Sequence, residues 1–162
     1  AFKFGFDLAD DWGKGGLIPG SIDFSLRGSY VMHRVNFVNV SDPTDQTELD
    51  GTVGFPKNRF LVTTAWNYGK LRISHDLDYF TSMDFEEAES YIGNEDSGLQ
   101  LFRKTGPFTQ HDLTATYELN DNFSFRAGVV NLFDNEPPLR VLYDDLWDLW
   151  GRRYFIGATA TF

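Results

Sequence analysis

Apolar and polar residues alternate along most of this chain, and this period of two residues most strongly constrains its fold. At the start, Phe2, Phe4 and Phe6 alternate with polar or small residues. Alternation of this kind indicates a β-strand with one apolar and one polar face. In the second run the apolar phase slips after Val31, which predicts either a bulge or an exit from the apolar layer. We count seven such runs, which begin near residues 2, 22, 59, 70, 108, 123 and 153.

The connections between these runs alternate between short and long. Tight turns at 67–70 and 119–122 carry the Gly, Asn and Asp that hairpins require, so the strands are predicted to be antiparallel. Long connections at 40–57, 83–107 and 134–150 hold much of the acid of a chain with 14 Lys+Arg and 24 Asp+Glu. Tight turns at one rim and long loops at the other are typical of an outer-membrane barrel.

A soluble β-sandwich also alternates, but three features favour an all-β, antiparallel transmembrane barrel. Several runs are long enough to match the roughly 9–11 residues that a tilted strand needs to cross a bilayer. Aromatic residues make up 17% of the chain and gather near strand ends, as in interfacial girdles. The polar face carries charges that a packed core would leave unpaired. The residues predicted to face a wet lumen are Arg27, Arg72, Asp76, Asp78, Asp112 and Arg126.

Composition excludes several other classes of protein. No apolar run approaches the roughly 18 residues of a membrane-spanning helix. The isoelectric point is near 4.6 and there is no basic cluster, which argues against nucleic acid as a partner. The absence of cysteine excludes disulfides, thiolate metal sites and cysteine nucleophiles.

The last third of the chain carries a recognisable motif. Residues 128–138 read Gly-Val-Val-Asn-Leu-Phe-Asp-Asn-Glu-Pro-Pro, and a final strand ends in Phe162. Together with Asp112 and Tyr117 upstream, this pattern resembles the C-terminal part of TonB-dependent outer-membrane receptors. The alternate residues of the final strand resemble the signal that the barrel-assembly machinery reads; they are Tyr154, Ile156, Ala158, Ala160 and Phe162.

This resemblance implies a fold and a function. Such receptors have 22 strands around an N-terminal plug, and a short segment contacts TonB. Because seven strands leave two edges that are untenable in lipid, we expect residues 1–162 to be the C-terminal part of the barrel, without the plug. The implied function is active uptake of a scarce nutrient, a carbohydrate or a metal chelate, across the outer membrane of a Gram-negative bacterium. Expected partners are outer-membrane lipid, the barrel-assembly machinery, TonB through the plug, and a small-molecule substrate.

The third long loop contains the most suggestive candidate for ligand binding. Aromatic rings beside carboxylates are typical of sugar recognition, and the predicted contacts are Tyr143, Asp144, Asp145, Trp147 and Trp150. The alternative interpretation is that the two tryptophans pack the loop onto itself or lie at the membrane rim. Acidic loops favour a neutral or cationic ligand over an anionic ferric siderophore.

The sequence gives little support for catalysis, a metal or a cofactor. His33, His75 and His111 lie on different strands without metal-ligand spacing, and the last two share the phase of the apolar face. The competing hypothesis is an outer-membrane enzyme, a rim protease or lipase that uses His33 with Asp42 or Asp45. A small structural barrel is a further alternative.

Overall fold

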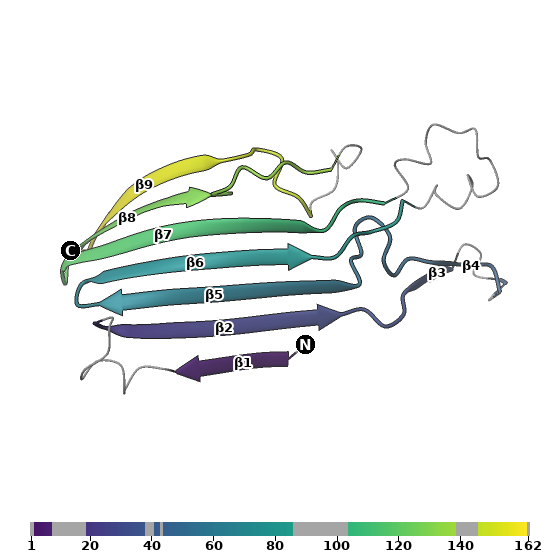
Figure 1. Ribbon diagram of the computed structural model, residues 1–162, viewed down its shortest axis with the longest axis horizontal. Helices are drawn as coiled ribbons and strands as arrows, with labels where there is room; N and C mark the ends of the chain where they lie inside the picture. Colours follow the sequence, from purple (N-terminus) through teal and green to yellow (C-terminus); the bar gives the residue numbers. More distant parts are fainter. Residues whose placement is uncertain are drawn as a thin grey trace.

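The computed structural model describes residues 19–37, 41–42, 44–85, 104–138 and 146–161, and the backbone of residues 2–7. These residues form a seven-stranded sheet in the order β1-β2-β5-β6-β7-β8-β9 and a separate ribbon of β3 and β4. Figure 1 shows the tight turns and the C-terminus at one end of the sheet, and the ribbon at the opposite end.

Each strand of the sheet pairs antiparallel with the next one along the chain, apart from the ribbon that interrupts the order. The strands are β1 (Phe2–Asp7), β2 (Ser21–Tyr30), β5 (Asn58–Tyr68), β6 (Leu71–Phe80), β7 (Phe108–Asn120), β8 (Phe123–Val130) and β9 (Arg153–Ala160). The prediction of seven antiparallel strands is confirmed. At 10, 11, 10 and 13 residues, β2, β5, β6 and β7 have the length of bilayer-crossing strands.

The chain leaves the main sheet after Tyr30 and forms the ribbon of β3 (Val35–Phe37) and β4 (Gln46–Glu48). Of the two outcomes that the phase slip predicted, exit from the apolar layer is the one that occurs. The ribbon itself was not predicted, because three-residue strands are too short to show a period of two.

The strand register places polar residues on one face of the sheet and apolar residues on the other. Thr63 lies opposite Asp76, which lies opposite Asp112 on the next strand. The adjacent residues Val62 and Leu77 are also paired, but they point to the other side because successive side chains alternate. The sheet therefore has one polar face and one apolar face, as the alternation predicted.

Close backbone approach fixes the start of β2. Gly20 has φ of 105°, and a Cβ built on it would lie 2.1 Å from the carbonyl oxygen of Asn67. No side chain fits there, so glycine is required. Beside it, the indole N–H of Trp66 donates to the carbonyl oxygen of Pro19 at 2.8 Å. These contacts hold the connection into β2 against the end of β5.

The sheet is open in the part of the chain that the structure describes. β1 and β9 lie at its two edges, and each pairs with a single neighbour among the described strands. Within the same residues, no helix has both the length and the apolar character needed to cross a membrane.

Candidate functional site

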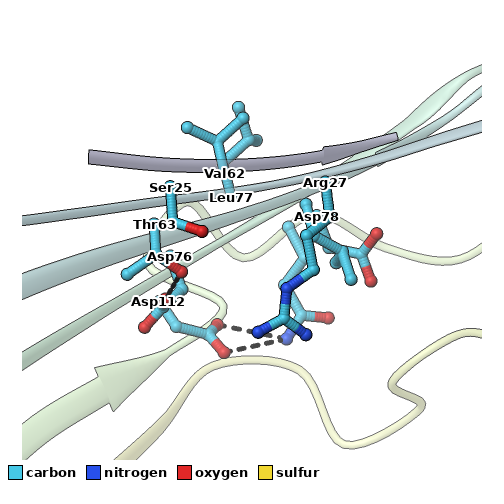
Figure 2. Close-up of a pocket in the computed structure, with 10 residues that line it drawn as sticks. Ser25, Arg27, Val62, Thr63, Asp76, Leu77, Asp78 and Asp112 are labelled. Carbon is cyan, nitrogen blue, oxygen red and sulfur yellow. Dashed lines mark hydrogen bonds between the residues drawn. The ribbon is translucent and has the colours of Figure 1, made fainter. Parts of the chain in front are cut away.

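A cavity of about 310 Å³ lies on the polar face, across β2, β5, β6 and β7. Figure 2 shows Val62 and Leu77 pointing to the opposite side of the strands from Arg27, Asp76 and Asp112. The cavity therefore opens on the charged side of the sheet. Its lining residues are Ser25, Arg27, Leu61, Val62, Thr63, Asp76, Leu77, Asp78, Gln110 and Asp112.

Hydrogen bonds hold two of the carboxylates around this cavity. Arg59 donates from two nitrogens to Asp78. The hydroxyl of Thr63 donates to Asp76 at 2.6 Å. These half-buried carboxylates thus have donors within the wall, which offsets the cost of removing them from water.

Asp112 links the wall to the loop that follows β8. Its Oδ1 accepts from the side chain of Gln110 at 3.1 Å and from the backbone N–H of Asn131 at 2.9 Å. Arg27 differs from its neighbours, because its guanidinium forms no hydrogen bond or ion pair with another described residue. Among the described residues, the cavity thus contains one cation without a hydrogen-bonded partner, beside carboxylates that already accept hydrogen bonds.

A second cavity, of about 260 Å³, lies on the same face and shares Asp76 with the first. It is lined by Arg72, Ser74, Asp76, Thr114, Thr116 and Arg126. Arg72 donates to Asp23 at 2.9 Å and to Asn67. The guanidinium of Arg126 lies 5.3 Å from the ring centre of Phe155. The two cavities give the polar face a continuous surface of hydroxyl, carboxylate and guanidinium groups.

A buried apolar cluster lies where the long loops meet the polar face. We call it the rim cluster; its buried members are Phe80, Met83, Phe108 and Trp147, and Val53, Phe85 and Leu146 pack against it. These residues come from all three long loops and from the ends of β6 and β7. The rim cluster therefore joins three loops that are distant in sequence.

Trp147 contributes a large ring to the rim cluster. It is 4% exposed, and its indole meets Phe80 edge-on with ring centres 5.4 Å apart. Its Nε1 is buried and has no hydrogen-bond partner among the described residues. A buried donor without an acceptor costs roughly 1–3 kcal/mol, so packing rather than hydrogen bonding holds this indole.

Backbone hydrogen bonds tie two of these loops together above the rim cluster. Val53 donates its N–H to the carbonyl of Asp84 at 3.0 Å, and Asp84 donates to Gly51 at 2.7 Å. On the other side, Thr105 donates to the carbonyl of Met83 at 2.8 Å. Segments 51–53, 83–84 and 104–105 therefore form a small network of bridges, which the sequence pattern did not predict.

The Asn-Leu-Phe-Asp motif forms a compact hydrogen-bonded turn after β8. Asn131 is fully buried with φ of 55°, and Asp134 has φ of 58°. The side chain of Asn131 donates to the carbonyl of Asn135 and accepts from its N–H, both at 2.9 Å. Asp134 accepts from the N–H of Arg152 at 2.8 Å. Asparagine and aspartate tolerate this backbone and supply these bonds, which explains the motif on structural grounds.

A comparison with protein-family models matches residues 4–132 to the family described as "TonB dependent receptor-like, beta-barrel". The match covers well over half of the chain. The chain belongs to this family. No curated protein matched. No solved structure matched.

Membership in the TonB-dependent receptor family confirms the resemblance inferred from the C-terminal motif. The family match extends upstream of that motif to β1. Proteins of this family are receptors and transporters of the Gram-negative outer membrane rather than enzymes. Interaction with TonB and with a substrate follows for the family in general.

The residues predicted to face the lumen share one face of the receptor barrel sheet. Asp76 is paired with Asp112, and Arg126 with Thr116, which in turn faces Arg72. Arg27 and Asp78 both lie opposite Leu61. On this face, strands β2 and β5–β9 carry as many arginines as carboxylates: Arg27, Arg59, Arg72, Arg126 and Arg153 against Asp23, Asp76, Asp78, Asp112 and Glu118.

The predicted ligand contacts are placed only in part. Tyr143, Asp144 and Asp145 lie outside the described residues. Trp147 is buried in the rim cluster, whereas Trp150 is 80% exposed. Their spacing of three residues did not distinguish these two environments, because the loop lacks a regular period. Ligand binding by this segment stays a prediction.

The residues predicted as an assembly signal lie on the apolar face of β9. Tyr154 pairs with Val129, and Ile156 with Ala127, so they share a face with apolar neighbours. Ala158 and Ala160 follow in the same alternation. Phe162 lies outside the described residues. Recognition by the assembly machinery stays a prediction.

The proposed hydrolase pair at the rim is not the arrangement that the structure shows. Nδ1 of His33 lies 3.9 Å from Asp50, and Asp42 instead accepts hydrogen bonds from Thr44. Among the described residues, no three His, Cys, Asp or Glu side chains lie close enough together to hold a metal ion.

The Asp50–Lys57 ion pair makes the first long loop sensitive to acid. Lys57 lies 3.2 Å from Asp50, and its hydrogen bond holds the pKa of that carboxyl below its ordinary value. A lowered pKa stabilises the loop above about pH 4, and this contribution is lost as the pH falls through the lowered pKa. We expect Lys57→Met to remove most of this contribution above about pH 4 and so to weaken the acid dependence of the loop, measured by hydrogen exchange of residues 49–55. Lys104→Met, which removes the partner of Asp84, is the control; an identical change in both variants would contradict this assignment.

Proposed function

We propose that this chain forms part of the wall, lumen and outer mouth of a receptor that imports a scarce nutrient into the periplasm. Residues 1–162 would be the C-terminal part of a larger barrel of 22 strands, with its plug elsewhere. The open edges at β1 and β9 support this proposal, since unpaired strand edges are not tolerated in lipid. In this arrangement the tight turns face the periplasm and the long loops face outward.

The observation that carries the proposal is the polar face, with two cavities that share Asp76. On β2 and β5–β9 its arginines and carboxylates are equal in number, so this part of the wall has little net charge. Hydroxyls of Ser74, Thr114 and Thr116 add donors and acceptors that hold no formal charge. Such a surface suits a neutral, hydroxyl-rich ligand, and we therefore place carbohydrate ahead of an anionic metal chelate.

At the mouth, the segment proposed to bind the ligand contains Tyr143, Asp144, Asp145, Trp147 and Trp150. The exposed ring of Trp150 is available to stack on a sugar face, while Asp148 accepts from its backbone N–H at 3.0 Å. Trp147 acts by anchoring the segment in the rim cluster, because its own ring is buried.

Binding measurements on the full-length receptor test this proposal. We expect labelled neutral oligosaccharides of a mixed panel to bind, and ferric hydroxamate and catecholate complexes to bind more weakly. Loss of one stacking ring is worth about 1–2 kcal/mol, so Trp150→Ala should weaken binding about tenfold, and Trp150→Phe should retain most of it. Trp66→Phe, at the opposite rim, is the matched control. Preference for the ferric complexes, or unchanged binding by Trp150→Ala, would contradict the proposal.

A further inference from the structure

The apolar face contains a small polar interruption. Aromatic residues lie near both rims of this face on β2 and β5–β9. Between them, the described residues of the face are apolar except for Thr64, His75 and His111. Thr64 is paired with His75, and His111 lies diagonally from His75 on β7. We call these three residues the histidine patch.

The two imidazoles hold each other in place. Nε2 of His75 lies 2.9 Å from Nδ1 of His111, and the rings stack with centres 5.2 Å apart. The ring of Phe133 meets His111 edge-on at 4.8 Å and is 60% exposed. The pair is therefore a preformed arrangement rather than two independent side chains.

Among the described residues, each imidazole forms one hydrogen bond, to the other imidazole. A neutral imidazole has one donor and one acceptor nitrogen. Their mutual bond uses one of each, so either tautomer leaves one N–H and one lone pair, at Nδ1 of His75 and Nε2 of His111. Hydrocarbon satisfies neither group, and polar groups facing a bilayer are costly unless they are paired.

The position of the patch indicates which lipid groups are within reach. Phe60 and Tyr79 form the aromatic row of the outer rim, and His111 lies one row inside it, beside Leu77. Two residues along a strand tilted by about 45° correspond to about 5 Å of depth. Since aromatic belts mark the headgroup level, His111 lies near the linkages between headgroup and acyl chains.

We propose that the histidine patch binds the linkage of an amide-linked lipid in the outer leaflet. An amide offers both a carbonyl acceptor and an N–H donor, which matches the one donor and one acceptor that the pair leaves unused. An ester linkage offers acceptors only and leaves the imidazole lone pair without a partner. The hydroxyl of Thr64 adds a further donor beside His75. This inference rests on the proposed function only in that it places the apolar face in the outer membrane.

The test uses the full-length receptor in phosphatidylcholine nanodiscs, with retained lipids identified by native mass spectrometry. N-palmitoyl-1-deoxysphinganine and dipalmitoylglycerol are added in equal amounts, because each carries two chains and one hydroxyl and they differ in amide against ester linkage. We expect the receptor to retain the amide lipid about five- to tenfold more, as one additional hydrogen bond provides. His75→Leu combined with His111→Leu should abolish this preference and still insert, because leucine suits a lipid-facing position.

Leu77→Ile combined with Leu113→Ile is the matched control, because these residues are the cross-strand neighbours of the histidines. This control should keep the preference. Equal retention of both lipids by the native receptor, or an unchanged preference in the histidine variant, would overturn the inference. So would a second protein chain that is retained by the native receptor and lost from the histidine variant. Insertion into the nanodisc is scored separately, so failure of the membrane placement is distinguishable from failure of lipid recognition.

Discussion

Replacing Trp147 by alanine in the full-length receptor is expected to loosen all three outer loops together. Trp147 is buried against Phe80 and shares the rim cluster with residues of the other two loops. Removing a buried indole costs roughly 3–5 kcal/mol, and we expect the lower end because its unpaired N–H is removed as well. Amide exchange in segments 49–55, 81–85 and 104–108 should then accelerate about 100-fold.

Two variants distinguish packing from other effects of the Trp147 substitution. Trp147→Phe keeps part of the apolar contact and loses the unpaired N–H together with the smaller ring, so it should accelerate exchange much less than alanine does. Trp150→Ala changes an exposed ring and should alter only its own segment. If Trp147→Ala accelerates exchange near residue 147 alone, the three loops are not joined by the rim cluster.

Replacing Asn131 by alanine is expected to produce the second large effect. The change removes both side-chain bonds to Asn135 and leaves the Asn135 N–H without its acceptor. It also places alanine at φ of 55°, which favours asparagine or glycine. Together these terms lower stability by roughly 3 kcal/mol. The measurement is the urea midpoint of the folded, heat-modifiable receptor in detergent.

Asn131→Gly separates the two causes of this effect. Glycine accepts the positive φ but still lacks the amide, so the glycine variant should recover about 1 kcal/mol relative to alanine. Asp134→Asn, which keeps an acceptor for the Arg152 N–H, should stay near the native midpoint. If the Asn131→Ala variant has the native urea midpoint, the turn after β8 does not depend on this side chain.

The period of two residues predicts the strands of this fold well, because it follows directly from side-chain alternation. It assigns Asp76 and Asp112 to one face and His75 to the other without any knowledge of pairing. It does not give the register between strands. The contact between His75 and His111 depends on a diagonal relation across β6 and β7, so the sequence placed both histidines on the apolar face but not next to each other.

The loops were the least predictable part of the candidate site. The burial of Trp147 and the exposure of Trp150 depend on residues of other loops, among them Val53 and Met83. Three-residue strands such as β3 carry no readable period. The reciprocal bonds between Asn131 and Asn135 were not foreseen, because hydrogen bonds within a loop leave no period in the sequence.

The central claim is that the apolar face of the sheet contacts lipid and the polar face lines a wet lumen. The most direct test is a cysteine scan along β6, from Leu71 to Tyr79, in the full-length receptor, with a nitroxide spin label at each position. Collision with dissolved oxygen should be strong at odd-numbered positions, and collision with a water-soluble nickel chelate at even-numbered positions. This period of two, with its phase, is the result we predict. Equal access to the nickel chelate on both faces, or the opposite phase, would contradict the account.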